Sequence, residues 1–375
     1  MTPSAPSAPK SRYIMLGGFL GAGKTTAVAA LAQHLDGLGQ RVGLITNDQG
    51  SELVDTTMLR ARGYQTEEIT GGCFCCRFNT LTDAAQKLTE RTRPDVFIAE
   101  PVGSCTDLVA TVTYPLRRIY GEAFTIAPLS VLVDPIRAER VLGLATGGNF
   151  SPKVTYIYRK QLEEADLLVI TKLDLLDAPR LERLRAALAK EFPGREVLAV
   201  SVRTGEGVSA WFEKITSGEQ SERSTMFVDY EVYAEGEALL GWLNATVQLS
   251  SASPFDTDTL LKNFATRVQR QLATKGAEIA HLKMTLSPDD GLGDVAAVNL
   301  VRSDFVPELS LRLEEPITSG QLIVNCRAEA APETIRDAVS EAAAELAATG
   351  ITAELQHLEF FRPGKPQPTH RDTVA

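Results

Sequence analysis

The sequence predicts an α/β protein, in which a parallel sheet with helices on both faces is followed by a smaller α+β domain. Three observations support this fold class. Short apolar runs alternate with helical stretches over the first 215 or so residues, a different order follows a polar segment, and 375 residues are enough for about two domains. Such alternation is typical of parallel sheets that are buried on both faces.

The first domain is expected at residues 13–215, after a flexible tail, rich in proline and serine, at residues 1–12. Helices are predicted at Thr25–Leu38 and Leu181–Phe192, where apolar residues recur at helical spacing. Strands are predicted where short apolar runs occur, at Tyr13–Leu16, Val42–Thr46, Val96–Ala99, Ser130–Val133, Leu167–Thr171 and Val197–Val200.

A polar linker at residues 216–225 is expected to lead into an α+β domain at residues 226–362, and residues 363–375 read as an extended tail. The predicted order of strand, helix, strand, strand, strand, helix and strand is that of a ferredoxin-like domain. These elements are Ala245–Leu249, Thr257–Ala273, Ile279–Thr285, Val295–Val301, Gly320–Asn325, Glu333–Ala348 and Thr352–Phe360.

Composition excludes several classes of function. Lys and Arg number 38 against 48 Asp and Glu, giving a formal net charge of −10. An acidic chain with no long basic run is a poor partner for nucleic acid or for an anionic membrane surface. No run approaches the roughly 18 apolar residues of a membrane span, and the N-terminal residues have no apolar core of signal-peptide length. We therefore expect a cytoplasmic protein that binds neither nucleic acid nor membrane.

The most specific motif is Gly18-Phe-Leu-Gly-Ala-Gly-Lys-Thr25, which follows a strand and opens a helix, as a phosphate-binding P-loop does. Backbone amides of the loop are expected to converge on phosphate oxygens, Lys24 to reach the outer phosphates and Thr25 to help hold Mg²⁺. The alternative, a glycine-rich turn without a ligand, is disfavoured by this context. The predicted nucleotide-binding residues here are Gly18, Gly21, Ala22, Gly23, Lys24, Thr25 and Thr26.

A second segment, Thr171-Lys172-Leu-Asp174, lies at the end of an apolar strand, where a guanine-reading loop is expected. A carboxylate there accepts two hydrogen bonds from the guanine edge, which adenine does not offer, so the wrong base leaves it unpaired. Ser201 opens the loop after the next strand and is predicted to complete the base pocket. Such short matches are weak alone, and their order after the P-loop favours a guanine nucleotide.

Two loops between these motifs are candidate switches. Glu100-Pro-Val-Gly103 ends a strand, so Glu100 is expected to hold Mg²⁺ directly or through water and Gly103 to offer an N–H to the terminal phosphate. Asn47-Asp48-Gln-Gly50 follows another strand, and Asp48 is the best candidate for positioning the attacking water. The alternatives are a strand-terminal Glu that faces solvent and an ordinary turn.

A cysteine cluster, Cys73-Phe-Cys75-Cys76, suits soft or borderline metals such as Zn²⁺. Because three thiols fall within four residues, we expect only two to face one way, with an outside carboxylate, His or water completing the donors. The alternatives are buried small hydrophobes or a redox pair. Cys105 and Cys326 are isolated in sequence and are predicted to be packed residues, and five cysteines, an odd number, do not predict a disulfide framework.

The segments GGFLGAGKTT, NDQG, GGCFCC, EPVG and TKLD, in this order, resemble the CobW-type family of P-loop GTPases over about residues 12–215. The resemblance implies GTP hydrolysis with Mg²⁺ and binding of a divalent metal, of zinc or cobalt type, at Cys73, Cys75 and Cys76. It also implies a role in metal-centre or cofactor assembly. The family usually has Glu at the position of Asp48.

The chain departs from the family pattern at several positions. EPVG replaces E-T-x-G, so Pro101 stiffens this loop, and TKLD replaces N-K-x-D, which removes an amide. Ser51 stands where many members carry a second Glu, and Glu52 is a candidate substitute donor. No His-rich stretch is present in the sequence.

In the second domain, an aromatic and acidic segment at residues 228–244 is either a docking surface for a partner or, as we favour, core around Trp242. His281 is expected to be an interior residue.

The favoured function is a GTPase that couples its cycle to delivery of a divalent metal to an unidentified client metalloprotein or cofactor enzyme. The alternatives are a metal store or sensor with nucleotide as a structural ligand, and an ATP-dependent P-loop kinase or ligase. The sequence leaves homodimer formation open.

Overall fold

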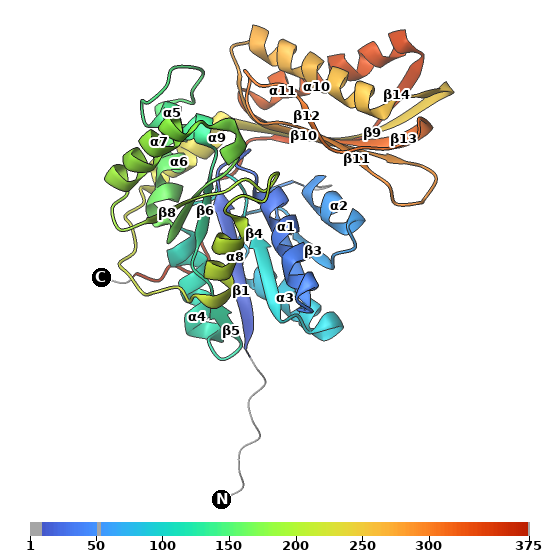
Figure 1. Ribbon diagram of the computed structural model, residues 1–375. Coiled ribbons are helices and arrows are strands. Elements are labelled where there is room, and N and C mark those ends of the chain that lie inside the picture. Colours follow the sequence, from blue (N-terminus) through green and yellow to red (C-terminus); the bar gives the residue numbers. More distant parts are fainter. Residues whose placement is uncertain (1–9, 51–53, 374–375) are drawn as a thin grey trace, which may run out of the picture.

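The computed structural model describes residues 10–50 and 54–373, which form two sheets, each covered by helices (Figure 1). Most of the expected N-terminal tail lies outside this range, and Ser11 and Arg12 already belong to the first strand. Ser51 and Glu52, the positions at which a metal donor was expected to be lost and replaced, also lie outside it.

The first sheet is parallel, as predicted, and its strand order is β3-β2-β4-β1-β6-β7-β8, with β5 pairing the start of β1. The central strand β1 leads directly into the P-loop and so positions this loop at the carboxyl edge of the sheet. All strands predicted for this sheet are confirmed, and the short β3 and β5 are additional. The strands are β1 Ser11–Gly18, β2 Val42–Asn47, β3 Thr66–Ile69, β4 Val96–Glu100, β5 Phe124–Ile126, β6 Ser130–Val133, β7 Leu167–Ile170 and β8 Glu196–Ala199.

Side chains of β1 alternate between two cores, which explains why its apolar run is continuous. Tyr13 and Met15 pack in one core, whereas Ile14 and Leu16 pack in the other, with α1 and α8. Helices therefore cover both faces of this sheet. They are α1 Lys24–Gly37, α2 Val54–Ala61, α3 Phe78–Thr92, α4 Tyr114–Tyr120 after a π-helical turn at Val109–Thr113, α5 Pro135–Val141, α6 Pro152–Glu164, α7 Ala178–Glu191 and α8 Val208–Ser217, with a 3₁₀ turn at Leu173–Leu175.

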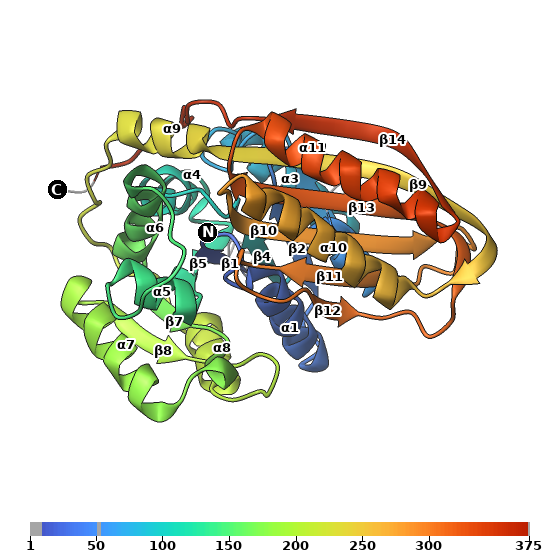
Figure 2. The ribbon, with the colours of Figure 1, turned by 90° about the horizontal axis from the view of Figure 1, so that it is seen from above.

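The second sheet is antiparallel, with the order β12-β11-β10-β13-β9-β14. All seven predicted elements occur in the predicted order, as β9, α10, β10, β11, β13, α11 and β14. The strand β12, which was not predicted, pairs with β11 at the edge of the sheet. Figure 2 shows α10 and α11 over its outer face. The elements are α9 Tyr230–Leu239, β9 Leu240–Phe255, α10 Thr257–Thr274, β10 Glu278–Pro288, β11 Ala296–Leu300, β12 Glu308–Leu311, β13 Ile317–Glu329, α11 Pro332–Ala344, a 3₁₀ turn at Glu345–Thr349 and β14 Ile351–Phe361.

The segment between the two sheets packs against the first domain. The Gln220 N–H donates to the carbonyl of Ile126 at 2.8 Å, and α9 crosses α6 so closely that a Cβ at Gly236 would lie 2.5 Å from the Lys153 oxygen. Trp242, at the start of β9, is fully buried in a core of the first domain, which confirms the core interpretation of this residue. No helix within residues 10–50 and 54–373 is long and apolar enough to cross a bilayer.

Candidate functional site

The predicted P-loop connects β1 to α1 and borders a cavity of about 390 Å³. Gly18, Gly21 and Gly23 have φ angles of 128°, 79° and 95°, a region that residues with side chains avoid. A Cβ at Gly18 would lie 2.5 Å from the carbonyl oxygen of Leu132. The glycines thus permit the tight loop that a phosphate cradle requires. Among the cavity-lining residues are Gly21, Ala22, Gly23, Lys24, Thr25 and Thr26.

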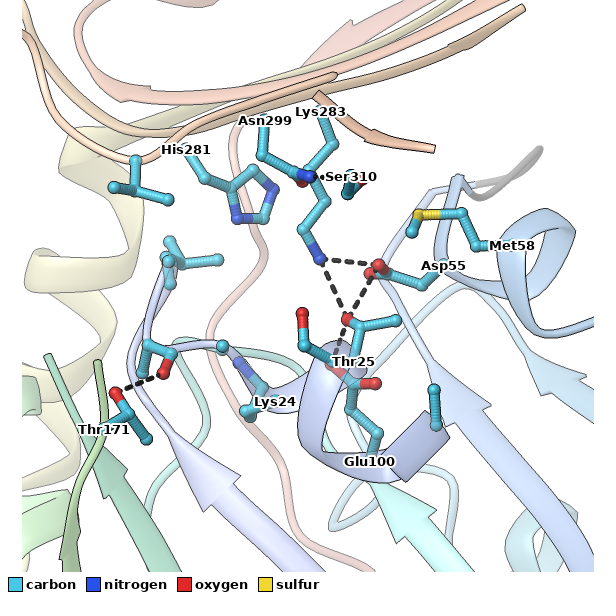
Figure 3. Close-up of a pocket in the computed structure, with 18 of the residues that line it drawn as sticks. Lys24, Thr25, Asp55, Met58, Glu100, Thr171, His281, Lys283, Asn299 and Ser310 are labelled. Atoms are coloured by element: carbon cyan, nitrogen blue, oxygen red, sulfur yellow. Dashed lines mark hydrogen bonds and ion pairs between the residues drawn. The ribbon is translucent and has the colours of Figure 1, made fainter. Parts of the chain in front are cut away.

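Lys24 and Thr25 lie side by side at the N-terminus of α1 (Figure 3). Lys24 is buried, and its Nζ lies 3.4 Å from the Phe19 carbonyl within the loop. Burial lowers the pKa of Lys24. Thr25 Oγ1 lies 2.8 Å from Asp55 Oδ1 and 2.9 Å from Glu100 Oε1. A second carboxylate, Asp55 of α2, therefore joins the predicted pair of Thr25 and Glu100, and no sequence motif indicated it.

These oxygens fit a hard divalent cation. Glu100 is buried at the end of β4, and its Oε2 has no hydrogen-bond partner among the described residues. Burial, followed by the charge of Asp55, raises the pKa of Glu100 to about 7. Mg²⁺ prefers carboxylate and hydroxyl oxygens, so Thr25, Asp55 and Glu100 are the residues that would hold it.

The expected guanine-reading segment reaches the same loop from β7. Thr171 Oγ1 donates to the Ala22 carbonyl at 2.9 Å, and Lys172 Nζ donates to the Gly21 carbonyl at 2.9 Å. Asp174 Oδ1 accepts a hydrogen bond from Ser201 Oγ at 2.7 Å. All four predicted base-pocket residues thus line the same cavity as the P-loop.

Both candidate switch loops border the cavity. A Cβ at Gly103 would lie 3.0 Å from the backbone nitrogen of Leu20, so this loop and the P-loop touch through glycine. Asp48 lines the cavity, and its Oδ1 accepts a hydrogen bond from Arg327 Nη2, on β13 of the second domain, at 2.9 Å. Arg327 has no exposed surface, and its guanidinium stacks 4.1 Å from the Trp242 ring. Asp48 is therefore committed to an ion pair between domains that the sequence did not indicate.

The second domain forms the other wall of the cavity (Figure 3). His281 is buried, as expected of an interior residue, yet it lines the cavity, and burial holds its pKa well below the usual value. Lys283, also on β10, reaches Asp55 and Thr25 with its ammonium. Neither residue belongs to a sequence motif. Their position in the cavity becomes apparent only because the second sheet packs over the P-loop.

The cysteine cluster lies between β3 and α3, and its three sulfurs converge. Cys73 Sγ is 2.8 Å from Cys75 Sγ and 3.4 Å from Cys76 Sγ, and the latter two are 3.6 Å apart. The expectation that only two thiols face one way is wrong, because the amides of Cys76 and Arg77 both donate to the Cys73 carbonyl and close a tight turn. Three sulfurs so close to one another form a ready donor set for a divalent metal.

Two further groups lie beside the cluster. The Cys105 thiol contacts Cys73, and this contact holds the pKa of Cys73 well below its usual value. Cys105 is therefore packed, as predicted, but not isolated, whereas Cys326 is buried in the core of the second domain. Glu237 of α9 is buried, and its Oε1 has no hydrogen bond of good geometry from any described residue, although Ser104 adjoins it. Burial, aided by the charge of Cys73 and opposed by hydrogen bonds from Ser104 and Gln49, raises the pKa of Glu237 to about 8.

The C-terminal segment covers the cluster. The Gln367 N–H donates to Cys76 Sγ at 3.2 Å, and the Thr369 N–H donates to the Cys75 carbonyl at 2.8 Å. The His370 ring packs edge-on against Phe78, with the ring centroids 4.9 Å apart. The sequence indicated an extended tail here, and the structure places it, extended, along the first domain.

The cysteine cluster and the first candidate switch loop share hydrogen bonds. Asn47 Nδ2 donates to the Gly72 carbonyl at 2.7 Å, and Asn47 Oδ1 accepts from the Phe74 N–H at 2.9 Å. Gln49 Nε2 donates to Glu237 Oε2 at 3.1 Å. Movement of this loop would therefore displace groups on two sides of the cysteines.

The strand–loop–helix geometry, the buried Lys-Thr pair and the carboxylates facing them define a P-loop nucleotide-binding protein with a thiol cluster next to a candidate switch loop. The chain belongs to the family described as CobW/HypB/UreG, nucleotide-binding domain, which matches residues 12–199.

Curated relatives include two zinc chaperones. The chain is 30% identical over 246 residues to the zinc chaperone CobW of Sinorhizobium sp, covering 59% of this chain and 67% of that protein. It is 28% identical over 184 residues to the zinc chaperone YjiA of Escherichia coli (strain K12), covering 47% and 53%, so the match spans about half of YjiA. Among solved structures, Zn(II)-bound YjiA GTPase from E. coli is 15% identical, covers 89% of this chain and 99% of that chain, and has a TM-score of 0.37.

Proposed function

We propose that this protein hydrolyses GTP and uses the GTP cycle to control the binding and delivery of a divalent metal ion, of zinc or cobalt type, to a client protein. Family membership supports GTPase activity. The single observation that carries the coupling is the pair of Asn47 hydrogen bonds, to Gly72 and from Phe74, which joins the switch loop to both sides of Cys73.

For the nucleotide, we propose that the backbone amides of the P-loop and the ammonium of Lys24 neutralise negative charge on the phosphates. Mg²⁺, when bound through Thr25, Asp55 and Glu100, would neutralise further charge on the outer phosphates. Water would add to the γ-phosphorus as its bond to the bridging oxygen breaks, which releases GDP and phosphate. Asp174 and Ser201 would read guanine, and the Gly103 N–H would report the terminal phosphate.

For the metal, we assign Cys73, Cys75 and Cys76 as donors to an ion that is cargo. Thiols lose their protons on binding such an ion, so affinity rises with pH. We assign Glu237, a buried carboxylate whose charge interacts with that of Cys73, as an additional donor. A metal held mostly by one loop next to a switch can be given up when that loop moves.

The decisive experiment is a zinc titration, against a chromophoric chelator, of the metal-free protein with GDP and with a non-hydrolysable GTP analogue. We expect zinc affinities that differ at least fivefold between the two states, since coupling energies are typically about 1–3 kcal/mol. Cys75→Ala should lower both affinities, and Cys326→Ala, a buried cysteine in the other core, should not. Equal affinities together with negligible turnover would instead favour a metal store or sensor.

Hydrolysis itself is tested by phosphate release from GTP and ATP. We expect a guanine-selective reaction that Lys24→Ala abolishes and that Lys87→Ala, on the exposed face of α3, leaves unchanged. Equal use of ATP would contradict the base assignment and favour the kinase or ligase alternative. Sedimentation of the same samples in each nucleotide state would show whether a homodimer forms.

A further inference from the structure

The second domain places a lysine inside the nucleotide pocket. Lys283 Nζ, on β10, lies 2.6 Å from Asp55 Oδ1 and 3.1 Å from Thr25 Oγ1. Figure 3 shows this side chain extending from the second sheet towards the N-terminus of α1. The Lys283 and Asp55 side chains are 16% and 22% exposed, so most of their water has been removed. This pair is therefore less screened than a surface salt bridge.

Lys283 supplies a positive charge that the carboxylates of the site need. Asp55 and Glu100 both approach Thr25, and the ammonium of Lys24 is turned towards the Phe19 carbonyl. Burial lowers the pKa of Lys283, but the charges of Asp55 and Glu100 outweigh it and hold the pKa above its usual value. Lys283 is thus a charged counterion of this pair of carboxylates.

The oxygens that Lys283 contacts are two of those that fit Mg²⁺. Mg²⁺ takes oxygen ligands at about 2.0–2.1 Å with near-octahedral geometry. An ammonium that donates to Thr25 Oγ1 and Asp55 Oδ1 uses oxygen lone pairs that Mg²⁺ would need from the same two atoms. Two cations at one pair of oxygens also repel each other strongly in a desolvated site. Lys283 and Mg²⁺ therefore exclude each other at this position.

We propose that Lys283 is a positioning residue that acts as an internal cation: it holds Thr25 and Asp55 in the nucleotide-free protein and releases them when Mg²⁺ enters with the nucleotide. This inference rests on the proposed binding of GTP and Mg²⁺. Its consequence is that Mg²⁺ binding breaks a contact between the two domains.

The packing of α2 shows how this release would be transmitted. Val54 and Met58 of α2 are buried against Ala297 and Ile323 of the second sheet. The Val54 N–H also donates to Asn325 Oδ1 at 2.9 Å. Asp55 therefore sits on a helix attached to the second domain, and the bond from Lys283 to Thr25 links that unit to α1. Loss of this bond would loosen the second domain from the P-loop.

A zero-length cross-link tests the exchange in the unmodified protein. A water-soluble carbodiimide joins a lysine to a carboxylate only where the two are in contact, and mass spectrometry identifies the pair. We expect a Lys283–Asp55 cross-link in nucleotide-free protein, and in protein with a GTP analogue and EDTA. Its yield should fall at least fivefold with the analogue and Mg²⁺. The Lys153–Glu235 pair, at 2.7 Å on the surface, serves as the control that should not change.

A retained Lys283–Asp55 cross-link with Mg²⁺ and analogue present would overturn the proposal. Loss of the cross-link with analogue and EDTA would also overturn it, because the nucleotide rather than Mg²⁺ would then displace Lys283. Binding of a fluorescent GTP analogue is measured in the same samples. Absence of nucleotide binding would contradict the proposed function itself. Failure of the Lys283 proposal and failure of the proposed function are therefore distinguishable.

Variants provide the second readout, the Mg²⁺ concentration at half-maximal retention of the fluorescent analogue. Lys283→Met keeps the stem but removes the competing charge, so this midpoint should fall roughly tenfold, equivalent to about 1.4 kcal/mol. Lys283→Arg should stay close to the parent protein, and so should Lys262→Met, on the exposed face of α10. A Lys283→Met midpoint equal to that of the parent would overturn the competition, and circular dichroism verifies that the variant is folded.

Discussion

One cysteine of the cluster is prepared to carry negative charge. Contacts from the thiols of Cys105, Cys75 and Cys76 hold the pKa of Cys73 well below its usual value. The pKa of Cys76 is raised to about 11, first by its hydrogen bond to Cys73. A thiolate next to other thiols favours metal binding, because a metal ion bound first by the thiolate can then displace the protons of the neighbouring thiols.

Glu237 allows a prediction at this scale. Its Oε1 is buried and lacks a hydrogen bond of good geometry, and its charge interacts with that of Cys73. Glu237 is therefore the carboxylate that we expect to complete the metal site. Glu237→Gln should lower zinc affinity by about tenfold, the lower end of what loss of a supporting metal-site group costs. The measurement is competition with a chromophoric chelator at pH 7.5, where the parent carboxylate is partly ionised and the metal promotes its ionisation.

The matched control for this change is Glu164→Gln. Glu164 is also buried at the end of a helix, but it accepts hydrogen bonds from Thr106 Oγ1 and the Val109 N–H, each at 3.2 Å. This variant tests the general effect of neutralising a buried carboxylate in this domain. Equal zinc affinities of the Glu237 variant and the parent protein would remove Glu237 from the donor set.

Residues could be predicted from the sequence where a local segment fixes their geometry. Lys24 and Thr25 follow from the glycines around them, and Asp174 follows from its place at a strand end. Asp55, Glu237 and Lys283 could not be predicted, since each gains its role from a partner at least 30 positions away, such as Thr25 for Asp55. Tertiary packing alone creates these sites.

At the scale of elements, β13 holds the loop after β2. Arg327 of β13 is fully buried, donates to the Leu243 carbonyl at 2.7 Å and pairs with Asp48 at 2.9 Å. A buried cation of this kind is stable only while its charge is compensated. The ion pair therefore ties the position of this candidate switch loop to the integrity of the second sheet.

This tie predicts that Asp48→Asn destabilises the fold. The change leaves Arg327 as an uncompensated buried charge, which should lower the free energy of unfolding by roughly 3 kcal/mol. Asp95→Asn is the control, because its partner Arg41 is 58% exposed and the loss should stay below about 1 kcal/mol. Urea unfolding gives both values. A stable Asp48 variant with a reduced rate of hydrolysis would instead favour the predicted water-positioning role.

Helices and strands could be predicted where the pattern of apolar residues in the sequence is strong. The apolar strands of the first sheet and the amphipathic α10 and α11 appear in the sequence at nearly their observed positions. The edge strand β12, Glu308–Leu311, is half exposed and short, so it lacks an alternating apolar pattern long enough to be recognised. β9 is longer than the predicted Ala245–Leu249. Its C-terminal part was not recognised because it contains no apolar run, although Ser250 and Ser251 pair with neighbouring strands.

At the scale of the whole molecule, the C-terminal segment returns to the cysteine cluster. Residues 363–373 follow the last strand of the second sheet, yet they lie against the first domain. Arg371 pairs with the buried Asp107 at 2.7 Å, and Asp372 pairs with Arg118 at 2.8 Å. These anchors hold the Gln367 N–H against Cys76 and close one side of the cluster.

Removal of residues 363–375 should therefore expose the cluster without disturbing the core. We expect iodoacetamide to alkylate Cys76, which is already partly exposed, at least several-fold faster in the shortened metal-free protein. Arg371→Ala, which removes one anchor, should give an intermediate rate, because hydrogen bonds from Gln367 and Thr369 remain. Cys326, buried in the second domain, reports on unfolding and should stay unreactive in all three proteins. An unchanged Cys76 rate would mean that the segment adjoins the cluster without shielding it, and access for a client would then be controlled elsewhere.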